Sequence, residues 1–203
     1  MKQQHNGRVV SFVRHAFPEV DSSVDPAECA LSIAGTEAAK ALELPRDALI
    51  VSSPERKALQ TVSLAAEVAE VAVVVDPAFR EVDRVETVHA GFREARRAWV
   101  SGALDKRHEG WELPEEAATR FADALLRFSA PHLVVGTHGM ALTAWMVSCG
   151  VVDRGAPAVD FWDQLRFPEV MTVELTGAGG VLMVPERDGS FIAHSTQHHI
   201  GEK

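Results

Sequence analysis

The stretch HLVVGTHGMALTAWMVSCG, residues 132–150, joins a run of apolar residues directly to a helical pattern. Residues 132–137 predict a buried strand, and the helix is expected to begin near Gly139 and to end near Gly150. Apolar runs alternate with longer helical patterns along much of the chain, which is typical of an α/β fold in which strands and helices take turns. We therefore expect a mostly parallel central sheet.

Further elements are predicted on both sides of this unit. Short apolar runs predict five more strands, at residues 9–13, 48–52, 71–75, 170–176 and 181–185. The last two are separated by GAGG, which favours a hairpin that finishes one edge of the sheet. Helices are expected over about residues 32–42 and from Pro54 to about residue 70, the second with Ser53 as its N-cap.

Residues 80–130 are charged and helical in pattern, with a break around GALDKRHEGWELP at residues 102–114. We expect two helices there, inserted over one edge of the sheet, and a loosely held tail over about residues 187–203. No internal repeat or domain linker interrupts the chain. Residues 1–203 are therefore expected to form one domain, a three-layer α/β/α sandwich with this helical insertion and a C-terminal hairpin.

Composition fits such a domain and limits its partners. The 203 residues are 46% hydrophobic and 24% charged, enough to bury a sizeable core. The 20 Lys and Arg residues against 29 Asp and Glu residues give a formal net charge of −9, which argues against binding nucleic acid or an anionic membrane. Cys29 and Cys149 match neither a disulfide framework nor a metal motif, and no apolar run reaches the roughly 18 residues that a membrane span needs. We expect a cytoplasmic protein with reduced thiols.

Polar clusters follow three of the expected strands, at the point where each strand ends. Arg14 and His15 follow the first strand, SSPER at residues 52–56 closes the second and begins the next helix, and His138 and Gly139 follow the fourth. Ligands of open parallel sheets bind in the crevice outside the carboxyl ends of the strands. The three clusters are therefore expected to meet in space.

The chemistry of these residues favours a phosphoryl ligand. Arg56 lies in the expected first turn of a helix, where the helix dipole disfavours a cation unless an anion binds there. Two guanidinium groups offer forked donors to phosphate oxygens, and a neutral histidine between them is a nucleophile toward phosphorus. The alternatives are an ion pair of Arg56 with Glu55 or Glu81, and a hydrogen-bonded core position for His138.

Three motifs, in their order along the chain, resemble those of the histidine phosphatase (phosphoglycerate mutase-like) superfamily. They are RHA at residues 14–16, SSPERKALQT at residues 52–61 and THG at residues 137–139. LSIAG at residues 31–35 and FREVD at residues 79–83 are similar to two further segments of the family. The resemblance runs from about Arg8 to Met146.

The resemblance implies a mechanism and a set of site residues. His15 would be the nucleophile that becomes phosphohistidine, and Arg14, Arg56 and His138 would bind the phosphoryl oxygens. Glu81 would protonate the leaving oxygen and later activate the water that releases phosphate. The resemblance implies no metal ion and no other cofactor.

Several residues depart from the family pattern. Ala16 stands where a glycine is usual, Asp21 stands where many members have Asn, and no G-x-W-x-G pattern follows Glu81. An acidic Asp21 near a phosphate would repel it unless the side chain points away. Asp83 and Glu86 lie close to Glu81 in the sequence and are alternatives for the acid.

The activity expected from the resemblance is that of a phosphoric monoester hydrolase acting on a small phosphorylated substrate. One alternative is a phosphoglycerate-mutase-like phosphotransferase, which passes the phosphoryl group back to a sugar acid. Another is a non-catalytic protein that binds a phosphorylated ligand. The sequence leaves the identity of the substrate and the presence of a homodimer open.

Overall fold

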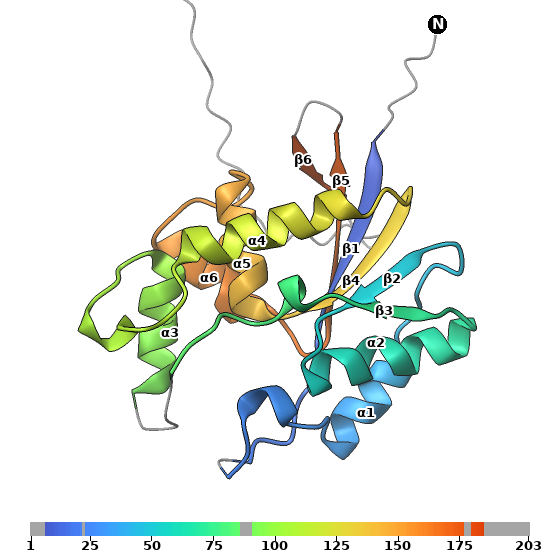
Figure 1. Cartoon of the computed structure of the whole chain (residues 1–203), viewed down its shortest axis with the longest axis horizontal. Coiled ribbons are helices and arrows are strands. Elements are labelled where there is room, and N and C mark those ends of the chain that lie inside the picture. Colours follow the sequence, from blue (N-terminus) through green and yellow to red (C-terminus); the bar gives the residue numbers. More distant parts are fainter. Residues whose placement is uncertain (1–6, 22, 86–90, 177–179, 185–203) are drawn as a thin grey trace, which may run out of the picture.

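A six-stranded sheet forms the centre of the protein (Figure 1). The structure, a computed structural model, describes residues 7–21, 23–85, 91–176 and 180–184, so the expected tail over residues 187–203 lies outside the described residues. The strands are β1 Arg8–Arg14, β2 Leu49–Ser52, β3 Val73–Val75, β4 His132–Thr137, β5 Glu169–Leu175 and β6 Val181–Met183. Their order in the sheet is β3-β2-β4-β1-β5-β6.

The sheet is mostly parallel, and the expected hairpin finishes one edge. β1 pairs in parallel with β4, and β2 pairs in parallel with both β4 and β3. β5 pairs antiparallel with β1, and β6 pairs antiparallel with β5. The parallel part therefore directs the carboxyl ends of β1, β2 and β4 to the same side.

Helices cover both faces of the sheet, which confirms the three-layer arrangement (Figure 1). They are α1 Ile33–Lys40, α2 Arg56–Ala69, α3 Phe92–Ser101, α4 Pro114–Arg127, α5 Gly139–Ser148 and α6 Ala156–Gln164. Along β4, Leu133 and Val135 contribute to the core under α4 and α5, whereas Val134 contributes to the core under α2. Alternate residues of a strand point to opposite faces, so one apolar run fills both cores.

The segment expected as an insertion contains α3 and α4. The short 3-10 helix Lys106–His108 lies in the break between them, and the indole of the buried Trp99 donates to the carbonyl of Glu112 at 2.8 Å. α3 packs on α6, where Arg93 and Arg97 both pair with Asp163. None of the helices in the described ranges is long and apolar enough to cross a membrane.

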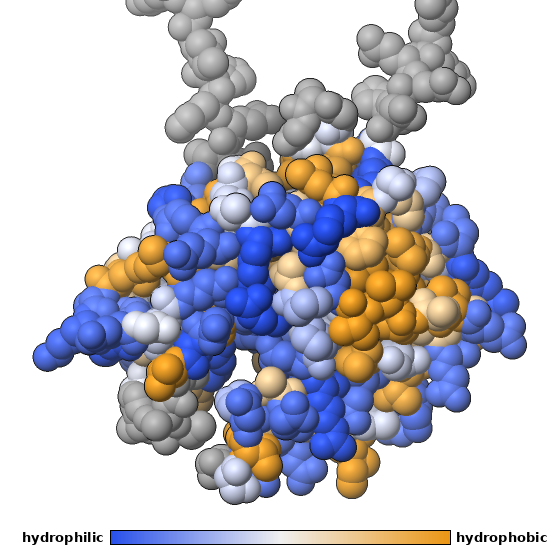
Figure 2. All heavy atoms as spheres, viewed as in Figure 1, coloured by the Kyte–Doolittle hydropathy of each residue, from blue (hydrophilic) through white to orange (hydrophobic). Residues whose placement is uncertain are grey.

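The edge strand β3 is only partly covered. Val74 and Val75 are exposed, and an apolar area at the right of Figure 2 lies over this edge of the sheet. Exposed edge strands are usually protected by being short, and β3 has three residues.

The start of α2 differs from the prediction. The helix begins at Arg56 with Glu55 as its N-cap residue, whereas the sequence favoured Pro54 as the first helical residue. The amide of Ser53 donates to the carbonyl of Gly136 at 2.9 Å, which continues the pairing of β2 with β4 past the end of the strand. Ser53 thus continues the strand pairing, and the helix begins two residues later than predicted.

Candidate active site

The three predicted clusters meet at the carboxyl ends of β1, β2 and β4. Arg14 lies opposite Thr137 in the sheet, and the amide of His15 donates to the carbonyl of Thr137 at 3.1 Å. The rings of His15 and His138 are 5.2 Å apart between centroids, and both residues are buried. Strand register therefore sets the distance between the two histidines.

His15 is held as a neutral base. Its Nδ1 lies 2.9 Å from the carbonyl oxygen of Ala16, and because a carbonyl only accepts, Nδ1 carries the proton and Nε2 is free. Burial lowers the pKa of His15 well below its usual value. Electrostatic interaction with His138, Lys57 and Arg14 lowers this pKa further. An unprotonated Nε2 is the form that can attack phosphorus.

Ala16 fits where the family usually has glycine. Its side chain is buried, its amide donates to Thr61 Oγ1 at 2.9 Å, and it is not among the described residues with positive φ. Thr61 in turn donates to the carbonyl of Lys57, and Gln60 accepts from the amide of Leu31. The Q-T pair of the motif thus holds both ends of the segment that connects β1 to α1.

Arg14 is a buried cation beside His15. Burial lowers its pKa to about 10, although the carboxylates of Glu81 and Glu169 act in the opposite direction. Its Nη1 donates to the carbonyl of Leu165. A Cβ added to Gly139 would lie 3.3 Å from the guanidinium carbon and 3.0 Å from the indole nitrogen of Trp162, so glycine allows α5 to begin close to Arg14.

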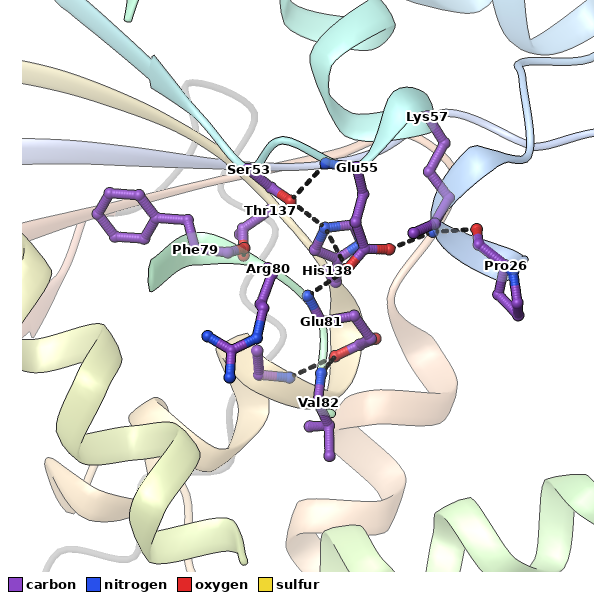
Figure 3. Close-up of polar contacts among 12 residues, drawn as sticks. Pro26, Ser53, Glu55, Lys57, Phe79, Arg80, Glu81, Val82, Thr137 and His138 are labelled. Atoms are coloured by element: carbon purple, nitrogen blue, oxygen red, sulfur yellow. Dashed lines mark hydrogen bonds and ion pairs between the residues drawn. The ribbon is translucent and has the colours of Figure 1, made fainter. Parts of the chain in front are cut away.

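His138 faces His15 from the start of α5. Its Nε2 lies 2.8 Å from Ser53 Oγ and 3.6 Å from Glu55 Oε1 (Figure 3). Burial, together with the charge of Lys57, lowers the pKa of His138 well below its usual value, against the opposing effect of Glu81. Its side chain is completely buried.

Two buried side-chain atoms in the described part of the chain have no hydrogen-bond partner. They are Nε of Arg14 and Nδ1 of His138. Buried polar atoms without a partner are rare in folded proteins. Both belong to side chains predicted to bind a phosphoryl group, so the buried atoms without a partner in the described ranges lie on two neighbours of His15.

The structure does not bring Arg56 into this cluster. Its side chain is exposed, and its guanidinium contacts the carbonyl of Glu28 at 3.5 Å. Lys57 is buried instead, and its charge acts on both His15 and His138. Successive helical residues point roughly 100° apart, so only one of the two can face the site.

Lys57 was missed although the sequence carries a signal for it. The row Thr61 and Ala65 lies on the buried side of α2, and Lys57 extends this row by one turn toward the N-terminus. The four-residue spacing back from Thr61 therefore places Lys57, and not Arg56, on the inner face once the helix starts at Arg56.

Glu55 joins Lys57 to His138 (Figure 3). Its Oε2 lies 2.5 Å from Nζ of Lys57, which also donates to the carbonyl of Pro26 at 2.8 Å. Its Oε1 accepts from the amide of Glu81 at 2.6 Å and lies near Nε2 of His138. The site thus contains a buried ion pair whose carboxylate also contacts the histidine.

The carboxylate of Glu81 is directed at the beginning of α5 (Figure 3). Oε1 accepts from the amides of Val82 and Ala141, each at 3.0 Å, and Oε2 accepts from the amide of Met140 at 3.3 Å. Burial alone would raise the pKa of Glu81, but the neighbouring charges of His138 and Arg84 and the amide donors lower it to about 2. Glu81 is therefore ionised at neutral pH in the free protein.

The other acidic residues considered from the sequence lie elsewhere. Asp83 is exposed, and Glu86 lies outside the described residues. Asp21 is exposed and accepts from the amide and hydroxyl of Ser23 at 2.8 and 2.6 Å. These bonds to Ser23 also lower the pKa of Asp21. Within the described ranges, no three His, Cys, Asp or Glu residues gather as ligands for a metal ion.

Comparison with known families agrees with the order of the motifs. The model of the histidine phosphatase superfamily (branch 1) matches residues 10–176. The chain belongs to the histidine phosphatase superfamily. The resemblance of the RHA, SSPERKALQT and THG motifs is thereby confirmed.

Solved structures of other proteins share the fold. A mycobacterial glucosyl-3-phosphoglycerate phosphatase matches with a TM-score of 0.65 at 19% identity, over 87% of this chain and 97% of that one. A mutant phosphoserine phosphatase from Entamoeba histolytica, in complex with phosphoserine, matches with a TM-score of 0.59 at 13% identity, over 87% and 95%. A protein described as mycobacterial hydrolase 1 has a TM-score of 0.65 at 19% identity, over 91% and 100%. No curated protein sequence matches the chain.

Proposed function

We propose that the protein is a metal-independent phosphatase that hydrolyses a small phosphomonoester through phosphohistidine on His15. The observation that carries this proposal is the neutral His15 flanked by two buried, unpartnered nitrogen atoms, Arg14 Nε and His138 Nδ1. A phosphoryl group supplies several acceptor oxygens, which Arg14 Nε–H lacks and which Nδ1 of His138 also needs in the tautomer that carries its proton there. Membership of the superfamily and the phosphatase neighbours support the same conclusion.

The reaction has two steps. Nε2 of His15 attacks phosphorus, a P–N bond forms while the ester P–O bond breaks, and the leaving oxygen takes a proton. Water then attacks phosphorus, the P–N bond breaks, and the water loses a proton, which yields inorganic phosphate and free His15. Arg14 and His138 stabilise the charge on the phosphoryl oxygens in both steps.

Glu81 is proposed as the group that gives and takes the proton. As an ionised carboxylate it is ready to act as the base of the second step. For the first step it must be protonated, and an approaching phosphate dianion raises the pKa of a nearby carboxylate. The protonation of Glu81 is thus coupled to substrate binding.

Lys57 is proposed as the second cation of the site in place of Arg56. Its buried ammonium group lies on the inner face of α2 and affects the pKa of both histidines. To bind a phosphoryl oxygen, Nζ must exchange its contact with Glu55 for one with the ligand. A lysine binds phosphate as a point charge, whereas an arginine offers a bidentate fork.

A non-catalytic phosphate-binding role is the second candidate, and the Glu55–Lys57 pair favours it. Glu55 holds Nζ of Lys57 at 2.5 Å, so this ammonium group cannot stabilise the charge of a transition state until the ion pair opens, whereas Arg14 and His138 remain to bind a phosphate. Turnover separates the two functions, because a binding protein would hold phosphate esters without releasing phosphate.

The test is hydrolysis of p-nitrophenyl phosphate by the wild type, His15→Ala and His132→Ala. His132 is the matched control, since it lies at the opposite end of β4 and pairs with Asp47 near the surface. We expect His15→Ala to abolish phosphate release and His132→Ala to preserve it, with EDTA having no effect. Full activity in His15→Ala, or loss in EDTA that Mg²⁺ or Zn²⁺ restores, would contradict the proposal.

We also propose that the protein is located in the cytoplasm. Cys29 and Cys149 are free, one buried and one exposed, which suits the reducing environment of the cytoplasm.

A further inference from the structure

Two phenylalanine rings lie next to the nucleophile and remain partly open to solvent. Phe17 is 54% exposed and Phe167 is 38% exposed. Their centroids are 5.7 Å apart in an edge-to-face arrangement, and the ring of Phe167 is 5.2 Å from that of His15. Phe167 also covers Arg14, with its centroid 3.6 Å from the guanidinium carbon. An apolar wall thus continues directly from the phosphoryl-binding residues toward solvent.

The backbone holds Phe17 in this position. Its carbonyl oxygen accepts from both the amide and the hydroxyl of Ser32, each at 3.0 Å. A side chain at Gly35 would collide with the same carbonyl, so the start of α1 is packed closely against Phe17. The ring is therefore presented at a fixed place although its own side chain is largely uncovered.

Phe167 is held in a similar way from the opposite end of the chain. Two residues before Phe167, the carbonyl of Leu165 accepts a hydrogen bond from Arg14. Two residues after Phe167, Glu169 pairs with Arg166 at 2.9 Å. The first contact ties the loop of Phe167 to Arg14 at the end of β1, and the second closes the loop around the ring. Two segments about 150 residues apart thus present aromatic rings at the same place.

The wall suits one kind of leaving group. An aromatic ring gains free energy when it covers apolar surface, and it offers no hydrogen bond to the hydroxyl groups of a polyol. We propose that Phe17 and Phe167 form a leaving-group site for phosphate esters of apolar alcohols, with an alkyl chain or an aryl ring. This inference rests on the proposed phosphoryl site at His15 and goes beyond it by naming the class of substrate.

The direct test measures the dissociation constants of n-alkylphosphonates from methyl to hexyl by calorimetry. Phosphonates lack the ester oxygen, so binding is measured without turnover. We expect the affinity to increase roughly twofold for each methylene from ethyl to hexyl, about half of the fourfold factor for a fully buried methylene. Propylphosphonate should bind more tightly than 2,3-dihydroxypropylphosphonate, which differs from it by two hydroxyl groups.

Variants connect this dependence to the two rings. Phe17→Ala and Phe167→Ala should reduce the total gain from ethyl to hexyl to less than about threefold, and Phe167→Leu should retain part of it. Phe17→Ala should leave the affinity for methylphosphonate unchanged, which shows that the phosphoryl site is intact. Leu126→Ala is the matched control, because Leu126 is an exposed apolar residue on α4.

The outcomes distinguish this inference from the proposed function. Equal affinity along the series, or equal affinity for the dihydroxypropyl ligand, would overturn the leaving-group site even if phosphate esters are hydrolysed. Affinity that rises with chain length, without phosphate release from hexyl phosphate, would support the site and contradict the phosphatase. If no phosphonate binds, the phosphoryl site and the leaving-group site both fail.

Discussion

Arg14, His15 and His138 form the strand half of the site, whereas Glu55, Lys57 and Glu81 form its loop half. The strand half stands on the ends of β1 and β4, and the pairing of the two strands sets its spacing. The loop half is held by side-chain hydrogen bonds, by an ion pair and by the amides of α5. The strand half therefore places the nucleophile beside Arg14 and His138, and the loop half contributes the second cation and the carboxylate proposed to transfer the proton.

The largest effect is expected in the strand half. Arg14→Ala should lower kcat/KM for p-nitrophenyl phosphate by a factor on the order of 10³, as for other arginines that stabilise phosphoryl transfer. Arg107→Ala is the control, since Arg107 is an exposed arginine paired with Asp105. A decrease of less than tenfold for Arg14→Ala would contradict a role for the strand half in binding the phosphoryl group.

The loop half should distinguish Lys57 from its neighbour. Lys57→Ala is expected to lower kcat/KM by a factor on the order of 10², because it removes the buried cation of α2. Arg56→Ala should change it less than tenfold, since Arg56 is exposed. The reverse order of the two effects would return the role to Arg56 and refute the placement of Lys57.

Glu81 links the loop half to the stability of the fold. Its pKa is lowered to about 2, so its stabilising contribution is present above pH 4.5, its usual pKa, and is lost as the pH falls toward 2. The loss should reach up to about 3 kcal/mol in the free energy of unfolding, at 1.36 kcal/mol per pKa unit.

Chemical denaturation of the wild type and Glu81→Gln between pH 5 and 2 measures this contribution. The free energy of unfolding of Glu81→Gln should not show this decrease at acid pH. Glu115→Gln, which alters an exposed carboxylate paired with Arg154, should behave as the wild type does. Parallel pH curves for Glu81→Gln and the wild type would show that Glu81 does not stabilise the start of α5.

The smallest effect concerns the protonation of His15. Because burial lowers its pKa below the usual 6.5, the ring should stay neutral as the pH falls from 7.5 to 6.5, with the proton on Nδ1. Imidazole ¹⁵N chemical shifts, assigned by comparison with His15→Ala, measure both the charge and the tautomer. Half-protonation at or above pH 6.5 would contradict the neutral nucleophile.

The strand half was predictable from the pattern of strands, whereas in the loop half Glu81 was predicted from the family resemblance alone and Lys57 was missed. The apolar runs and the α/β alternation locate Arg14, His15 and His138 at strand ends, and parallel pairing brings such ends together. Arg56 was favoured because the sequence places it in the first turn of a helix, where a cation suggests a bound anion. The four-residue spacing back from Thr61 was not used, although it places Lys57 on the inner face of α2.

The environments of Glu81 and Phe167 depend on residues that are far away in the sequence. Amides of α5, about 60 residues away in the sequence, bind Glu81, and Phe167 contacts Arg14, which is about 150 residues away in the sequence. Such contacts decide whether a carboxylate is ionised, and whether a phenylalanine belongs to the hydrophobic core or lines the active site. They become visible only when the fold is known.

The central claim is a covalent phosphoryl group on His15. The wild type is mixed with p-nitrophenyl phosphate, quenched in alkaline denaturant within the first turnovers, digested, and the peptides are analysed by mass spectrometry. We expect one phosphoryl group on His15, absent from His15→Ala and present in His132→Ala. Turnover with no phosphorylated peptide, or with the phosphoryl group on another residue, would contradict it.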